Sequence, residues 1–245
     1  MPDVERVVSI DGAELWVAER GEGIPLLLIN GGFGCADYLG GVADLVEDLG
    51  SVIRFESRGC GRSSREGTFE LDEMLADLEG LRESLGVDRW VVLGHSAGAD
   101  LALAYAVEHP DSTLGVIHLC GTGVQNDRDW KAAYEAGVEA GRNEPPFEIA
   151  WNREVNQKAN ASWRRWIKGP DLLRRLADLE VPFLFLYGER DIRPSFAVQQ
   201  VANLLPVAAY VEVAGADHWP WITHPHEIRH AVTRFLQTID HVPAL

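Results

Sequence analysis

The sequence contains little cysteine, little methionine and a deficit of positive charge. Its three cysteines, Cys35, Cys60 and Cys120, are widely spaced and form no C-x-x-C pair. The acidic start MPDVERVVSIDG has no apolar segment of the kind found in a signal peptide or a membrane-spanning helix. Together these absences predict a reduced protein of the cytoplasm.

The charge balance restricts the possible partners. Lys and Arg number 22 against 38 Asp and Glu, which gives a formal net charge of -16 at pH 7. Such a chain is poorly suited to bind phosphate backbones or anionic membranes, so we expect neither nucleic acid nor membrane as a partner. The HPH run at residues 224–226 lacks a cysteine or acidic partner at a spacing usual for metal sites, so no metal is predicted.

Apolar residues make up 46% of the 245 residues, enough for one substantial core. An antiparallel hairpin is predicted at the N-terminus, with its turn at Asp11-Gly12. Helical patterns then alternate with short apolar runs that suit strands covered on both faces, namely IPLLLING, SVIRFES, RWVVLGH, LGVIHLCG, VPFLFLYG and AAYVEVAG. The alternation predicts an α/β fold with a mostly parallel, doubly wound sheet.

One stretch interrupts this alternation. Residues 122–169 contain no buried-strand run and hold four of the eight tryptophans, Trp130, Trp151, Trp163 and Trp166. We interpret them as a small helical lid inserted into a core made of residues 1–121 and 170–245. The tryptophans either shape an apolar substrate site or fill the core of the insertion.

The segment WVVLGHSAGADLALAYA carries the strongest chemical signal. Gly94-His95-Ser96-Ala97-Gly98 matches G-x-S-x-G between a buried strand and a helix. Such a corner exposes the serine hydroxyl, while the glycines let neighbouring backbone pass close by. The helix N-terminus then points at the serine and favours a developing oxyanion. Ser96 is therefore the predicted nucleophile.

Around this motif the chain resembles the α/β-hydrolase family over nearly its whole length. The loops NGGFG and ESRGCGRS are most similar to those of the proline iminopeptidases, which carry H-G-G-P-G and D-Q-R-G-x-G-R-S. This sequence departs from them at Asn30, Phe33, Glu56 and Ser57 and has a shorter insertion. The resemblance implies the α/β-hydrolase fold and a serine hydrolase that needs no cofactor.

A serine hydroxyl needs a base, and the resemblance places that base on the loop after the last strand, where His218 stands. His224 and His226 flank Pro225 and are predicted to begin the last helix. His95 adjoins the nucleophile but points to the opposite face of its strand. His109 and His118 are predicted to end a helix and to lie in a strand.

The base also needs a buried acceptor that fixes its tautomer. The segment Tyr187–Asp191 resembles the G-x-x-D loop of the family and makes Asp191 the predicted acid. Asp127 is an alternative, because some members take the acid from the loop after the sixth strand. Glu189 and Asp217 are interpreted as turn residues.

Two backbone N–H groups are expected to form the oxyanion hole. One is that of Ala97, directly after the nucleophile. The resemblance gives the other to Gly32, with Phe33 as the alternative. Asn30 is expected to hydrogen-bond this loop, and Arg58 and Ser63 are expected to hold neighbouring loops.

The predicted function is hydrolysis of a small ester or amide through an acyl-enzyme. The weakest predictions concern substrate contacts, which we place at Phe33, Trp130, Trp151 and Trp219. Alternatives are an iminopeptidase, a carbon–carbon bond hydrolase or a cofactor-free perhydrolase on the same scaffold, and last a non-catalytic binding protein. An iminopeptidase needs acids that hold an ammonium group, and the insertion offers Glu135, Glu139, Glu144, Glu148 and Glu154.

Overall fold

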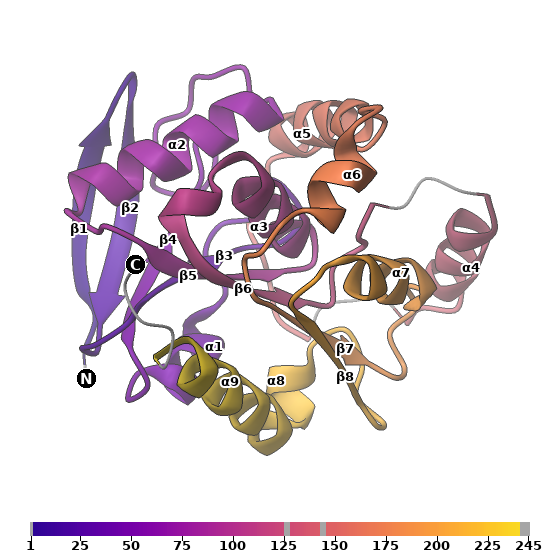
Figure 1. The fold of residues 1–245 in the computed structure, drawn as a ribbon. Helices are drawn as coiled ribbons and strands as arrows, with labels where there is room; N and C mark the ends of the chain where they lie inside the picture. The colour runs from indigo at the N-terminus through magenta and orange to yellow at the C-terminus, as the bar shows by residue number, and fades with distance from the viewer. Residues whose placement is uncertain (1, 125–127, 143–145, 241–245) are drawn as a thin grey trace.

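The computed structural model describes residues 2–124, 128–142 and 146–240. Its centre is an eight-stranded sheet with the order β1-β2-β4-β3-β5-β6-β7-β8 (Figure 1). The strands are β1 Val4–Ile10, β2 Ala13–Arg20, β3 Pro25–Ile29, β4 Ser51–Phe55, β5 Trp90–His95, β6 Thr113–Leu119, β7 Phe183–Gly188 and β8 Ala208–Val213. β1 and β2 form the predicted antiparallel hairpin, and β3 to β8 run parallel. The predicted fold class is confirmed.

Helices cover both faces of the sheet, as Figure 1 shows. They are α1 Gly40–Val46, α2 Leu71–Ser84, α3 Ala97–Glu108, α4 Arg128–Glu139, α5 Arg153–Trp166, α6 Leu172–Ala177, α7 Phe196–Leu204, α8 Pro220–Thr223 and α9 Pro225–Asp240. Alternate side chains of a strand enter different cores: Leu27 and Ile29 pack with α2 and α3, whereas Leu26 and Leu28 pack with α1 and α9. This explains why the central strands are continuous apolar runs.

Two elements differ from the expectation. β8 was predicted to be covered on both faces, but it lies at the edge of the sheet, and the side chain of Val211 is 38% exposed. Its apolar residues therefore do not indicate full burial. Helix α1 was not predicted, because it begins with Gly40 and Gly41, which are poor helix formers.

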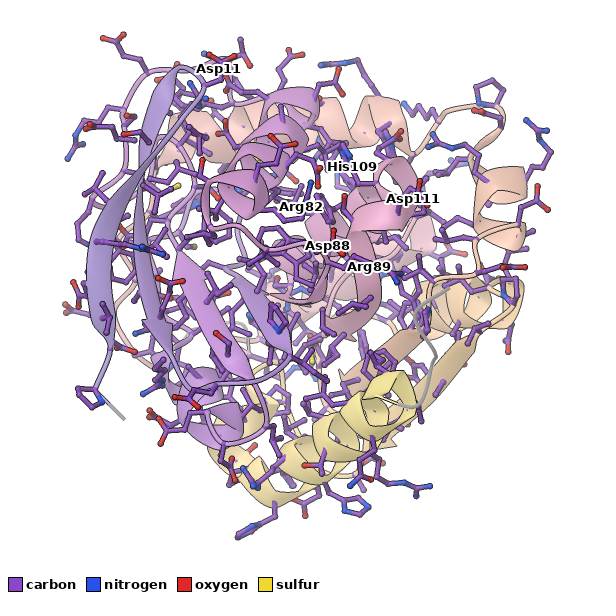
Figure 2. The ribbon with its side chains drawn as sticks, turned by 60° about the vertical axis from the view of Figure 1, so that its left-hand side comes forward. Asp11, Arg82, Asp88, Arg89, His109 and Asp111 are labelled. Carbon is purple, nitrogen blue, oxygen red and sulfur yellow. The ribbon has the colours of Figure 1, made fainter. Side chains whose placement is uncertain are left out.

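The end of the sheet opposite Ser96 is closed by polar contacts. Arg82 at the end of α2 donates to the carbonyl oxygens of Val87 and Asp88, just before β5. Arg89 donates to the carbonyl oxygen of Thr113 at the start of β6. Figure 2 shows these arginines gathered with His109, the predicted end of α3. The contacts pair backbone oxygens just before β5 and at the first residue of β6.

Residues 122–169, the predicted insertion, contain α4 and α5 and lie between β6 and β7, and their role as a lid stays a prediction. Figure 1 shows α4 near α7 and α5 near α2, at separate places along the rim of the molecule. Among the described residues, no helix combines the length and the apolar character needed to cross a membrane.

The strand order brings two loops together. After β4 the chain crosses over β3 to form β5, so the strand order reverses between β3 and β5. In open α/β sheets, the carboxyl ends of the strands at such a reversal are the usual place for a ligand. Here the loop after β3 is NGGFG and the loop after β5 is the Ser96 corner.

We expect Gly94→Ala to destabilise the fold strongly. A Cβ at position 94 would collide with the backbone of Gly98 and Ala99, which no side-chain rotation can relieve. Overpacking of this kind costs about 3 kcal/mol of unfolding free energy. Urea unfolding followed by circular dichroism measures the loss.

Gly41→Ala is the matched control. Gly41 is exposed, and a Cβ there would meet only Trp221, at an ordinary contact distance of 3.5 Å. We expect its unfolding free energy to stay unchanged or to rise by about 0.5 kcal/mol. Equal stability of the two variants would contradict the role assigned to Gly94.

Candidate active site

Ser96 occupies the corner between β5 and α3 in a strained backbone conformation. Its φ of 56° and ψ of -126° lie in a region that non-glycine residues rarely adopt. Its N–H donates to the carbonyl oxygen of Leu119 on the neighbouring strand at 2.9 Å. A Cβ at Gly98 would collide with the backbone of Ile29 and Asn30. The corner therefore depends on close backbone packing, as the motif predicted.

The NGGFG loop lies directly against this corner. A Cβ on Gly31 would be 2.8 Å from the Cβ of Ser96 and equally close to the carbonyl oxygen of His95. Asn30 holds the loop as expected, because its Nδ2 donates to the carbonyl oxygen of Phe55 and its Oδ1 accepts from the N–H of Tyr38, both at 3.0 Å.

Asp191 and His218 meet at the carboxyl ends of β7 and β8. The Nδ1 of His218 donates to the Oδ2 of Asp191 at 2.6 Å, and the Asp191 side chain is fully buried. Burial alone would raise the pKa of Asp191, but the neighbouring His218 and Arg193 outweigh it and lower that pKa to about 2. The carboxylate therefore stays ionised and fixes the tautomer in which Nε2 is free to accept a proton.

A cysteine completes this cluster. The sulfur of Cys120 and the ligand atoms of Asp191 and His218 all lie within 4.8 Å of one another. Burial raises the pKa of Cys120 well above its usual value, so the thiolate that a metal would need is disfavoured. The carboxylate and the imidazole are already hydrogen-bonded to each other. The donor set fits a hydrogen-bonded acid–base pair better than a metal centre.

His95 is a buried link between three loops. Its Nε2 lies 2.9 Å from the carbonyl oxygen of His218, so this nitrogen must carry the proton. Burial lowers the pKa of His95 well below its usual value, so the ring is neutral and Nδ1 is an acceptor. Tyr38 therefore donates its hydroxyl proton to Nδ1 at 2.7 Å, and its oxygen accepts the N–H of Gly31 at 2.6 Å. This series of hydrogen bonds joins the NGGFG loop, the Ser96 corner and the His218 loop.

The insertion also contacts the NGGFG loop. The side chains of Asn156 and Trp151 both donate to the carbonyl oxygen of Gly32, and the N–H of Asn152 donates to that of Gly34 at 2.9 Å. In a trans peptide the next N–H, that of Phe33, points the opposite way from this carbonyl. The orientation of the Gly32–Phe33 peptide is thus fixed by the insertion.

The side chain of Phe33, a predicted substrate contact, is buried. It is only 5% exposed and belongs to the main core, with its ring centroid 6.5 Å from that of Trp163. Its φ of 46° lies in the left-handed region that non-glycine residues rarely adopt. Its contact with the substrate stays a prediction, as does the alternative role of its N–H as oxyanion donor.

Some of the tryptophans pack against each other in the insertion, and the others contact loops of the candidate site. Trp163 and Trp166 stack on each other at 5.0 Å and fill the base of the insertion. Trp151 is 51% exposed beside Gly32, and Trp130 donates its indole N–H to the carbonyl oxygen of Pro194. Trp219 contacts the His218 ring edge-on, with 5.1 Å between centroids.

The rejected acids behave as turn residues. Glu189 accepts the N–H of Gly215 at 2.7 Å, and Asp217 accepts the N–H of Trp219 at 2.8 Å. Asp127, the alternative to Asp191, lies outside the described residues. Arg58 pairs with Asp77 and the Asp11-Gly12 turn, and Ser63 bridges β2 to Glu56, so both hold loops as expected.

Three residues of the site were not identified from the sequence: Tyr38, Asn156 and Arg193. Arg193 pairs with Asp191 through both its backbone N–H and its guanidinium. Its position two residues after a predicted triad acid was an available signal. Tyr38 and Asn156 gave none: Tyr38 joins the nearby Gly31 to His95, 57 positions away, and the Gly32 partner of Asn156 lies 124 positions away.

Comparisons with known proteins bear on the family and the fold of the chain. The alpha/beta hydrolase fold family matches residues 24–146. A proline iminopeptidase of Xylella fastidiosa is 37% identical over 140 residues, covering 54% of this chain and 42% of that enzyme. The alignments with this enzyme and with the iminopeptidases of Mycoplasma genitalium and Neisseria gonorrhoeae cover 32–42% of those relatives, whereas a proline iminopeptidase of Heyndrickxia coagulans aligns at 24% identity over 93% of its length.

Two solved structures share the fold over almost the whole chain. The proline iminopeptidase of Mycobacterium smegmatis gives a TM-score of 0.74 at 20% identity, covering 97% of this chain and 99% of that one. A thermophilic esterase from Thermogutta terrifontis gives 0.75 at 23% identity, covering 98% and 99%. Identities this low establish a common fold and leave the substrate open.

We expect Tyr38→Phe to lower the unfolding free energy by about 1–3 kcal/mol, because the N–H of Gly31 and Nδ1 of His95 both lose a buried partner. Urea unfolding measures this loss. Tyr210→Phe is the control, since the Tyr210 hydroxyl bonds an exposed carboxylate, that of Glu212, and its loss should change stability by less than about 0.5 kcal/mol. Similar losses in both variants would show that the buried hydrogen bonds of Tyr38 contribute no more to stability than exposed ones.

Proposed function

The chain belongs to the alpha/beta hydrolase fold family, and on that premise we propose that it is a serine hydrolase with Ser96, His218 and Asp191 as its catalytic triad. The observation that carries the proposal is the buried 2.6 Å hydrogen bond between His218 and Asp191. It lies at the same edge of the sheet as the strained corner at Ser96. A protein that only bound a ligand would have no need of this arrangement.

The mechanism follows from the hydrogen-bond polarity. Because Nδ1 of His218 donates to Asp191, Nε2 takes the proton of the Ser96 hydroxyl as the oxygen attacks a substrate carbonyl. The oxyanion is stabilised by the N–H groups of Gly32 and Ala97, with Phe33 as the alternative to Gly32. His218 then gives its proton to the leaving group. Water, deprotonated by His218, cleaves the acyl-enzyme and regenerates Ser96.

We further propose that residues 122–169 act as a lid on this site. Two contacts support the assignment. Helix α4 packs on the loop of the acid, where a Cβ on Gly137 would press into the side chain of Ile192. The segment before α5 pairs with the loop after β3, with the N–H of Ala36 donating to the carbonyl oxygen of Ala150 at 2.9 Å. The insertion thus touches the loop that carries Asp191 and the loop after β3.

The insertion favours an ester or amide with an apolar acyl group over a substrate with a free ammonium. Phe147 lies between Trp219 and Tyr38, at centroid distances of 5.0 and 5.8 Å, and forms an aromatic wall beside His218. Of the lid glutamates, Glu135 and Glu154 are exposed and paired with lysines on their own helices. Exposed, paired carboxylates hold an ammonium weakly.

Iminopeptidase activity is the second candidate, and the similarity to the Xylella fastidiosa enzyme favours it. Glu139 and Glu148 are exposed in the insertion, and Glu144 lies outside the described residues. The reacting groups would be the same in both cases. A small molecule is the substrate in either case, and the three free thiols fit a reducing compartment such as the cytoplasm.

A fluorophosphonate probe tests the nucleophile. We expect it to label the wild-type protein and not Ser96→Ala, because the phosphonate traps the activated hydroxyl. Ser63→Ala is the control: the Ser63 hydroxyl is buried between β2 and Glu56, and labelling of this variant should persist. Labelling of Ser96→Ala at the wild-type rate would refute the proposed nucleophile.

Kinetics with two chromogenic substrates test the substrate class. We expect kcat/KM for a short-chain p-nitrophenyl ester to exceed that for a prolyl p-nitroanilide by more than the difference in their intrinsic reactivity, because the lid offers aromatic rings rather than fixed carboxylates. Hydrolysis of each compound by hydroxide supplies the reference. Efficient anilide cleavage that disappears in Ser96→Ala and falls in Glu148→Gln would establish the iminopeptidase instead.

A further inference from the structure

Arg193 occupies an unusual place next to the proposed triad acid. Its Nη1 lies 3.1 Å from the Oδ1 of Asp191, and its backbone N–H donates to the same oxygen at 3.0 Å. The other oxygen, Oδ2, accepts from His218. One carboxylate is thus shared between a permanent cation and the imidazole that is to gain a proton.

The guanidinium is enclosed by the protein rather than exposed on its surface. The side chain of Arg193 is only 9% exposed. The ring of Tyr134 on α4 covers it, with 5.2 Å between the guanidinium carbon and the ring centroid. The hydroxyl of Tyr187 donates to the backbone carbonyl oxygen of Arg193 at 3.1 Å. Screening by water is weak at such a place, so the charge of Arg193 acts at close range.

We propose that Arg193 is a positioning residue that locks the Asp191 carboxylate and limits the negative charge felt by His218, so that the base remains unprotonated in mildly acidic solution. The proposal rests on the triad proposed above. Only neutral His218 can take the proton of Ser96, so the range in which the enzyme works is bounded on the acid side by the protonation of this ring.

The groups that face the His218 ring come from four segments: Asp191 and Arg193 after β7, His95 in β5, Cys120 after β6, and Asp217 in its own loop. Burial is the main cause that lowers the pKa of His218, and the positive charge of Arg193 lowers it further. Asp191 and Asp217 act in the opposite direction. His95 is neutral and Cys120 is a thiol, so neither compensates for a lost arginine.

The sign of the effect is therefore defined. Removing the positive charge at position 193 leaves Asp191 free to stabilise the imidazolium, which raises the pKa of His218. The acid limb of the pH profile of kcat/KM should then move to higher pH. A charge within a few ångströms of a titrating pair shifts it by on the order of one pH unit.

The experiment compares pH profiles of p-nitrophenyl ester hydrolysis for three variants. Arg193→Gln keeps a hydrogen-bond donor near Asp191 but removes the charge, and we expect its acid limb to move up by about one pH unit. Arg193→Lys keeps the charge, and its limb should stay within about 0.3 units of the wild type while its kcat falls. Arg190→Met removes an exposed charge one residue from Asp191, and its profile should not move.

Each outcome has a distinct meaning. An unmoved acid limb in Arg193→Gln, or equal shifts in Arg193→Gln and Arg193→Lys, would refute the electrostatic role and leave a purely structural one. Unfolding curves at each pH ensure that the profiles report folded protein, and Arg193→Lys still tests the proposal if Arg193→Gln does not fold. Persistent activity of Ser96→Ala would instead refute the triad itself, independently of Arg193.

Discussion

The strained corner at Ser96 is the constraint on which the rest of the site depends. A serine with a φ of 56° is held there only if its surroundings leave the backbone no better alternative. That requirement explains why Gly94 and Gly98 admit no side chain and why the NGGFG loop approaches the corner so closely. The cost of the strain is offset by the packed core beneath it, where β5 is buried along its whole length.

Hydrogen bonds of defined direction extend this constraint to the neighbouring loops. The carbonyl of His218 can only accept, so His95 must donate to it, and the order of donors and acceptors is then fixed as far as Gly31. The same logic fixes the tautomer of His218 through Asp191. Hydrogen bonds with only one possible assignment of donors and acceptors therefore join the loop after β3, the end of β5 and the loop after β8. These bonds limit the motion of the three segments relative to one another.

How well a feature could be predicted from the sequence depends on how far apart in the chain the interacting residues lie. The strands and the corner were predictable, because each depends on a pattern within a dozen residues, whereas the acid and base positions rest on family loops and stay predictions. The full burial expected of β8 was wrong, since position at the sheet edge is a property of the topology. Tyr38 and Asn156 were missed because their roles arise from contacts between distant segments.

Under the proposed function, the contacts of the insertion connect substrate choice to catalysis. Asn156 and Trp151 orient the Gly32 carbonyl, and α4 covers Arg193 through Tyr134, which in turn holds the acid. The residues of the proposed lid thus also contact the NGGFG loop and the arginine beside Asp191, the proposed acid. Under the proposed function, we expect a change of sequence in residues 122–169 to act on kcat as well as on KM, because the loops of the proposed site would lose supports that the sheet alone does not provide.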